Sequence, residues 1–170
     1  MFDVFLNVCE DVTRTATKIP QSEYLSSGDY PIYDQGQKYV SGYSNDGSKI
    51  VKNFPYIIFG DHTRILKYVN NECYIGADGV KLLKVTNEKY LPKYVYYNLL
   101  ANPIDNHGYS RHYKFLKELK IKQNSKEYQQ KIIDDLDNTN KIIEIKQKII
   151  AHLDELEKSR FISQEVTVWN

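Results

Sequence analysis

The stretch SKEYQQKIIDDLDNTNKIIEIKQKIIAHLDELEKSRFISQEV, residues 125–166, decides the architecture, because it is one long helical pattern without a glycine or a proline. Ser125 suits a helix N-cap, and apolar residues then recur three or four positions apart. About 35 helical residues, each rising about 1.5 Å, would span roughly 50 Å, which is more than one small domain needs. We therefore predict a single long helix over residues 125–165.

The apolar stripe of this helix has to be buried against another surface. Packing on the helix's own domain is one interpretation. The length, the repeat and the many charged residues on the other faces favour a coiled coil with a second helix. Thr139 and Lys146 interrupt one seam and can set its register or orientation. The residues predicted to face the partner helix are Ile132, Leu136, Ile143, Ile150, Leu153 and Leu156.

Residues 1–124 follow a different pattern, in which short runs of alternating apolar and polar residues are separated by turns. Residues 45–47 (NDG) and 77–79 (ADG) are strong turn signals, since Gly and Asp tolerate the left-handed backbone. Residues 91–103, LPKYVYYNLLANP, have helical spacing and reach a proline, which predicts a helix of about three turns. The predicted fold class is α+β, with a β-rich domain over residues 1–124 followed by the long helix.

Composition sets further limits. Lysines and arginines number 23 against 22 acids, so the chain has no overall basic field. The part before Lys126 carries 16 basic and 13 acidic residues, which places any polyanion-binding surface there. Cys9 and Cys73 lack metal-ligand spacing and are predicted to be buried free thiols. The chain shows neither a signal peptide nor a membrane-length apolar run, so we expect a cytoplasmic protein with no membrane association.

Residues 57–69, IIFGDHTRILKYV, place the polar residues Asp61, His62, Thr63 and Arg64 between two apolar runs. Successive strand residues point to opposite faces, so these side chains would converge only at a sharp turn, which Gly60 can provide. No nucleophile elbow, glycine-rich phosphate loop or HExxH motif accompanies them. The four histidines are scattered along the chain. We predict no catalytic residue and no metal site.

Recognition suits these residue types better. Two further loops, residues 37–49 and 106–115, interleave basic, aromatic and hydroxyl side chains in the same way, a combination that suits contact with nucleic acid. A solvated loop is the alternative for each of the three, and an internal Asp61–Arg64 ion pair is the alternative for the turn. The predicted DNA-binding residues are Lys38, Tyr39, Ser41, Tyr43, Ser44, Asp61, His62, Thr63, Arg64, Lys67, His107, Tyr109, Ser110, Arg111, His112 and Lys114.

In the order of these segments the chain resembles the specificity subunit of type I restriction–modification systems. Residues 7–44 resemble the start of a target recognition domain. The segments IIFGDHTRILKYV and YIGADGVKLLKV resemble a recurring version of its core, and residues 140–161 resemble the family's helical spacer. Two departures stand out. A complete subunit carries two copies of each part, whereas this chain has one. The proline-rich approach to the helix and the family's "EQ" are replaced by IKQNSKEYQQKI.

The resemblance implies a non-catalytic protein that reads one half of a bipartite site in double-stranded DNA. It implies docking of methyltransferase subunits and a restriction subunit, with S-adenosylmethionine, ATP and Mg on those partners and no cofactor bound by this chain. Since a full subunit pairs its two helices antiparallel, two half-length chains can form a homodimer with an antiparallel coiled coil. Pairing with a different half-subunit is one alternative. The other is a coiled-coil interaction protein or truncated decoy that competes for methyltransferase subunits without specific DNA reading.

Overall fold

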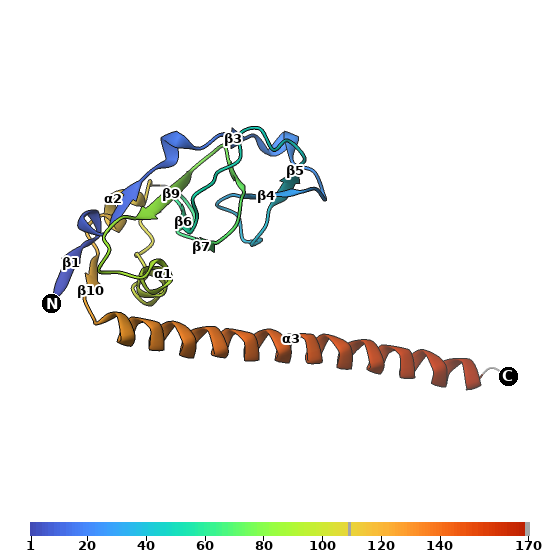
Figure 1. Cartoon of the computed structure of the whole chain (residues 1–170). Helices are drawn as coiled ribbons and strands as arrows, with labels where there is room; N and C mark the ends of the chain where they lie inside the picture. Colours follow the sequence, from blue (N-terminus) through green and yellow to red (C-terminus); the bar gives the residue numbers. More distant parts are fainter. Residues whose placement is uncertain (109, 169–170) are drawn as a thin grey trace. The chain divides into compact units, whose positions relative to one another are not determined.

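The structure is a computed structural model, and it describes residues 1–108 and 110–168, with the side chains of residues 162–168 left out. The chain divides into two compact units, Met1–Gln130 and Lys131–Asn170. The first unit is a β-rich domain with short helices, and the second is helical (Figure 1). The predicted α+β class, with a long helix after the β-rich part, is therefore confirmed.

Ten strands occur in the part of the chain that the structure describes, and they form three sheets. Their bounds are β1 (Phe2–Val4), β2 (Cys9–Asp11), β3 (Lys18–Ile19), β4 (Tyr30–Tyr33), β5 (Gly42–Ser44), β6 (Tyr56–Gly60), β7 (Leu66–Val69), β8 (Tyr74–Gly76), β9 (Val80–Val85) and β10 (Lys120–Lys122). The sheets have the orders β2-β9-β6-β7, β3-β8-β4-β5 and β1-β10. Pairing is antiparallel except where β8 runs parallel to β3 and β4.

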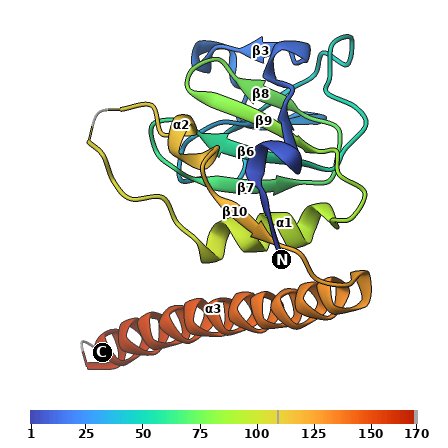
Figure 2. The ribbon, with the colours of Figure 1, turned by 90° about the vertical axis from the view of Figure 1, so that its left-hand side faces the viewer.

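The core of the first unit explains why β6 is apolar along its whole length. Ile58 and Tyr56 lie in the main core cluster, together with residues of β8 and β9. Phe59, one position away and therefore on the opposite face, lines a pocket with Leu99 of helix α1 (Pro92–Ala101). Because both faces of β6 are covered, alternation of apolar and polar residues is lost and the strand is buried throughout. Figure 2 shows β6, β7 and β9 side by side, with α1 along β7.

The helix predicted for residues 91–103 is confirmed as α1. Pro92 occupies its first turn, where a missing N–H costs nothing, and the helix ends before Asn102 and Pro103. The remaining short helices are η1 (Phe5–Asn7), η2 (Thr13–Thr15), η3 (Gln21–Glu23) and α2 (Tyr113–Leu116). Within residues 1–108 and 110–168 no helix combines the length and apolar character that a membrane span requires.

The long helix α3 (Lys126–Val168) begins where the sequence predicts. The hydroxyl oxygen of Ser125 accepts a hydrogen bond from the Tyr128 N–H at 3.3 Å, which is the predicted N-cap. One turn into the helix, Gln129 is fully buried within the first unit. Its side-chain oxygen accepts from the Leu91 N–H at 2.8 Å, and its amide nitrogen donates to the carbonyls of Lys89 at 2.8 Å and Asn124 at 2.9 Å. The start of the helix is thus attached to the β-rich unit.

Candidate nucleic-acid interface

The predicted turn of residues 60–65 joins β6 to β7. The Arg64 N–H donates to the Gly60 carbonyl at 2.7 Å, and the Gly60 N–H donates to the Ile65 carbonyl at 2.8 Å. A Cβ atom at Gly60 would lie 2.2 Å from the Thr63 hydroxyl oxygen, so this position requires glycine. Arg64 itself has a left-handed backbone, with φ of 64°. The prediction that Gly60 bends the chain is confirmed.

Asp61 points into the molecule, which corrects its assignment as a DNA contact. Asp61 is only 4% exposed, and its carboxylate accepts a hydrogen bond from the Tyr113 N–H at 2.7 Å. The Asp61 backbone is also engaged, since its N–H donates to the Gly79 carbonyl at 2.7 Å. The Asp61 carboxylate is therefore a brace for the turn, in the interior behind it.

His112 is fully buried against the same residue, so it too is corrected from a surface contact to a brace. Its N–H donates to the Asp61 carbonyl at 2.8 Å, and its ring Nδ1 lies 3.0 Å from that oxygen. Because a carbonyl can only accept, the ring proton belongs on Nδ1. That leaves Nε2 to accept from the His107 N–H at 3.3 Å. His112 thereby connects the turn to His107.

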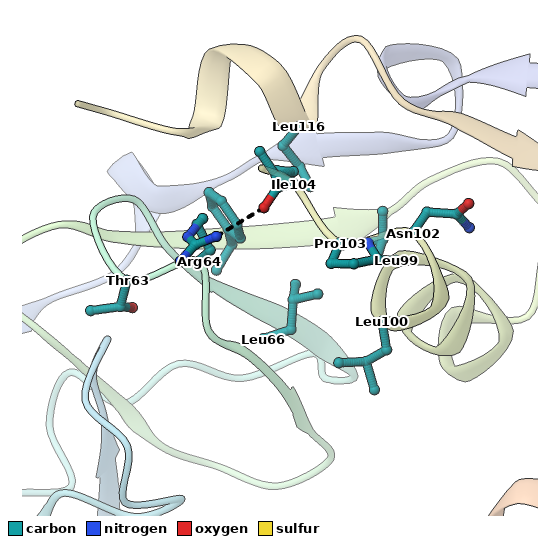
Figure 3. Close-up of a pocket in the computed structure, with 10 residues that line it drawn as sticks. Thr63, Arg64, Leu66, Leu99, Leu100, Asn102, Pro103, Ile104 and Leu116 are labelled. Carbon is teal, nitrogen blue, oxygen red and sulfur yellow. Dashed lines mark hydrogen bonds between the residues drawn. The ribbon is translucent and has the colours of Figure 1, made fainter. Parts of the chain in front are cut away.

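Arg64 is half-buried and bonded to the main chain. Its Nη1 donates to the Ile104 carbonyl at 3.0 Å, and its partner is not Asp61, so the turn is held without the internal ion pair considered as an alternative. Figure 3 shows Arg64 and Thr63 on one side of a pocket, with Leu99, Leu100 and Pro103 on the other. The pocket has a volume of about 230 Å³ and a mostly apolar lining.

Lys67 is 2% exposed and is the third predicted DNA contact that the structure places in the interior. Its Nζ donates to the Lys38 carbonyl at 2.6 Å and lies 3.6 Å from the Asp34 carboxylate. Burial lowers the pKa of Lys67 below its ordinary 10.5, while the charge of Asp34 and the hydrogen bond to it act in the opposite direction. The same carboxylate accepts from the Gly36 N–H at 2.7 Å and from the Ser41 hydroxyl. Lys67 and Asp34 together hold the loop of residues 34–41.

Gln35 connects that loop to the turn and was not among the predicted residues. Its side-chain oxygen accepts from the His62 N–H at 3.2 Å, and its carbonyl accepts from the Thr63 hydroxyl at 2.7 Å. The signal for this loop was the Asp34–Gly36 pair, since an aspartate two residues before a glycine favours an Asx turn. Through Gln35 and His112, the loop of residues 34–41 and the predicted loop that holds His107 and His112 are both connected to residues 60–65.

The other predicted DNA-binding residues lie at or near the surface. Exposed are Lys38, Tyr39, His62, Thr63, His107, Arg111 and Lys114, and half-buried are Ser41, Tyr43, Ser44 and Ser110. Tyr109 lies outside the described residues. The His107 ring stacks on Phe115, with ring centroids 4.0 Å apart, and Lys114 lies over the same phenyl ring. Tyr43 and Ser44 belong to β5, the edge strand of the other four-stranded sheet, so they stand apart from the turn.

The described residues contain no group of three or more His, Cys, Asp or Glu side chains that could hold a metal ion. Cys9 and Cys73 are free and buried, as predicted, and burial raises the pKa of each thiol to about 12. Neither thiol is poised for chemistry.

On helix α3 most of the residues predicted to face a partner are open to solvent. Ile132 is half-buried, whereas Leu136, Ile143, Ile150, Leu153 and Leu156 are exposed. Exposure of their residues runs from 39% at Leu136 to 61% at Leu156. Three further isoleucines of the helix, Ile142, Ile145 and Ile149, are also more than half exposed. An exposed apolar stripe of this length is typical of interaction surfaces.

Residues 7–155 match the model of a protein family described as Type I restriction modification DNA specificity domain. One similar solved chain comes from a structure described as the structural basis underlying complex assembly and conformational transition of the type I R-M system. It has a TM-score of 0.62 and 15% identity. Another is the crystal structure of the HsdS subunit from Thermoanaerobacter tengcongensis, with a TM-score of 0.51 and 16% identity. Each alignment covers 84% of this chain and 38% of the other, so the chain spans well under half of those relatives. A comparison with curated proteins found no match.

Proposed function

We propose a DNA-reading role for the first unit, starting from the fact that the chain belongs to the family of type I restriction–modification DNA specificity domains. Such a domain supplies sequence specificity and no catalysis. In this proposal residues 1–124 read one half of a bipartite site in double-stranded DNA. Residues 125–165 set the distance between the two halves and dock the partner subunits.

One observation carries the proposal for the first unit, namely the braced turn between β6 and β7. His62 and Thr63 are exposed at its tip, while buried Asp61 and His112 hold it from behind and Gln35 holds it from the side. A loop that is already ordered loses little conformational entropy on binding. Imidazole, hydroxyl and guanidinium groups can bond base edges in the major groove, and the guanidinium of Arg64 can grip guanine or a phosphate.

Arg64 has to exchange its bond to the Ile104 carbonyl for a DNA contact, or keep that bond with one Nη and use its remaining donors. The second course retains the turn geometry, and we favour it. The exposed side chains of Lys38, Arg111 and Lys114 would then lie toward the adjoining phosphates.

The exposed apolar face of α3 supports a homodimer. Two copies of this helix paired antiparallel would bury both apolar seams and relate the two reading units by a twofold axis. Identical units would read an inverted-repeat bipartite site. Methyltransferase subunits and a restriction subunit would complete the complex, with S-adenosylmethionine, ATP and Mg bound by those partners.

Selection from a pool of random duplexes, with the methyltransferase subunit present, tests the reading role. The expected result is enrichment of a bipartite motif with two inverted half-sites. Arg64→Ala is expected to cost about 1–3 kcal/mol of binding and to relax one position of the motif. Equal losses on every sequence would make Arg64 a phosphate contact. A stable protein complex without any enriched motif would instead favour the decoy.

Light scattering at tens of micromolar tests the dimer separately. The wild-type chain is expected to have twice the mass of one chain. Ile143→Glu combined with Ile150→Glu places charges on the apolar face and should give the monomer. Glu144→Gln combined with Lys148→Gln changes neighbouring polar residues and should leave the dimer intact. A monomeric wild type contradicts the homodimer and leaves the reading role standing.

A further inference from the structure

A polar hollow lies in the first unit beside the turn of residues 60–65, which we call the reading turn. The sequence did not predict this hollow. It has a volume of about 390 Å³ and is lined by Asp11, Thr13, Arg14, Lys18 and Lys81. These residues come from β2, η2, β3 and β9. We call it the η2 hollow.

The inner wall of the η2 hollow is built from fully engaged groups. The carboxylate of Asp11 accepts from Lys81 Nζ at 2.8 Å, from the Thr13 N–H at 3.0 Å and from the Thr13 hydroxyl. Burial alone would raise the pKa of Asp11, but the hydrogen bonds from Lys81 and Thr13 and the lysine charge hold it below its ordinary value. Thr13 is buried, and its hydroxyl oxygen also accepts from the Leu82 N–H at 2.9 Å. The single carboxylate of the hollow is therefore already neutralised.

The outer wall, by contrast, consists of charged side chains that are open to solvent. Arg14 and Lys18 are exposed, and in the described part of the chain neither side chain has a hydrogen-bond or ion-pair partner. Three cations against one carboxylate leave the hollow with a formal charge of +2. Two unpaired cations at a polar hollow of this size match a phosphate group, which an arginine can grip with two parallel hydrogen bonds.

The η2 hollow is connected to the reading turn by direct contacts. Lys81 pairs with Phe59 across the β6–β9 ladder, next to the Gly60 at which the turn begins. The Nζ of Lys81 also lies 4.7 Å from the centroid of the Tyr113 ring, and the Tyr113 N–H is the donor to Asp61. Through Lys81 the hollow is thus in contact with Tyr113, the residue whose N–H holds Asp61 behind the turn.

We propose that the η2 hollow binds a backbone phosphate of the DNA strand next to the bases that the turn reads, with Arg14 and Lys18 as the two contacting cations and Lys81 as a positioning residue. This rests on the proposed reading function and adds the register-setting contact to it. Phosphate contacts fix the orientation of a protein on the duplex, so this contact would determine which bases the turn can reach.

Salt-dependent binding of the full chain to a random-sequence duplex tests the proposal. Each phosphate contact that is lost lowers the slope of log Kd against log salt concentration by about one, because fewer counterions are released. Arg14→Gln combined with Lys18→Gln removes both cations from that one phosphate and should therefore lower the slope by about one. Arg14→Lys combined with Lys18→Arg keeps both charges and should keep the slope.

A matched control removes two charges elsewhere. The control combines Lys120→Gln with Lys122→Gln. Both lysines are exposed and belong to β10, which is in a different sheet. This variant should change the slope by well under one. Equal slopes for the wild type and the Arg14/Lys18 variant would contradict phosphate binding in the η2 hollow and would leave the reading function intact. A wild type that binds no duplex at low salt contradicts the reading function itself.

Two further measurements separate the sources of the anion. In the first, inorganic phosphate replaces chloride at constant ionic strength. If the hollow binds a phosphodiester of the DNA, this exchange should weaken duplex binding equally in the wild type and in the Arg14/Lys18 variant. Stronger release from the wild type would assign it to free phosphate instead. In the second, binding to the methyltransferase subunit is measured. If the Arg14/Lys18 variant kept its duplex binding but lost the methyltransferase subunit, the η2 hollow would bind an acidic protein surface instead of DNA.

Discussion

The carboxylate of Asp61 accepts a hydrogen bond from the backbone N–H of Tyr113 at 2.7 Å, across a sequence separation of 52 residues. This contact turns the acid of the predicted reading loop inward. It leaves His62 and Thr63 at the tip of the turn and attaches the turn to the start of α2. The turn is therefore positioned by the fold of the whole first unit and not by local backbone preferences alone.

Replacing Asp61 by alanine should destabilise the first unit by about 1–3 kcal/mol, because the N–H of the half-buried Tyr113 loses its acceptor. Asp61→Asn retains a side-chain oxygen and should cost less. Urea unfolding followed by circular dichroism measures both. Glu88→Ala, at an exposed position, serves as the control. If Asp61→Ala weakened DNA binding at unchanged stability, Asp61 would be a DNA contact after all.

Among the residues of α3 that belong to the first unit, Gln129 should be the one whose substitution lowers stability most. Gln129→Ala removes the acceptor of the Leu91 N–H and the donor to two carbonyls, and an unsatisfied buried group costs about 1–3 kcal/mol. Gln129→Glu should cost more, since a carboxylate would face the carbonyl oxygens of Lys89 and Asn124. Thermal unfolding compares these variants with Lys126→Ala, an exposed residue of the same turn. Equal midpoints for all three would contradict a role for Gln129 in attaching the helix.

Lys67 should make stability depend on pH in the alkaline range. Because burial lowers its folded-state pKa below 10.5, the unfolded chain binds more protons than the folded chain between the two values. The free energy of unfolding should therefore rise, relative to Lys67→Met, as the pH increases through the folded pKa toward 10.5. Urea unfolding of the two proteins across this range measures the difference. A difference that stays constant or falls with pH would contradict the lowered pKa.

The thiols of Cys9 and Cys73 should be unreactive in the native protein. Burial raises the pKa of each to about 12, so the thiolate population at neutral pH is very small and shielded from reagent. Iodoacetamide labelling followed by mass spectrometry should show both thiols unmodified in buffer and both modified in denaturant. Rapid labelling of either thiol without denaturant would mean that the segment around it opens readily.

Features that depend on neighbouring residues were predicted well. The helix over residues 91–103, the turn at Gly60 and the Ser125 cap all follow from local backbone preferences and from hydrogen bonds within a few residues. The alternation along β7 also carried a signal that was missed. Lys67 stands two residues before Val69, and both face the interior of the sheet. A lysine on the buried face of a strand indicates an internal partner, which Asp34 and the Lys38 carbonyl provide.

By itself the sequence determined that a β-rich unit precedes a long helix, and that three polar loops are candidates for DNA contact. Only the tertiary structure decided which side chains of those loops face solvent. Asp61, His112 and Lys67 find partners 29 to 52 residues away, and burial of a polar group is stable only where such partners exist. The η2 hollow has the same origin, since Arg14 and Lys81 lie far apart in the chain and line one surface only after β2 pairs with β9. Periodicity describes one element at a time, whereas the partners of a polar side chain depend on how the elements pack.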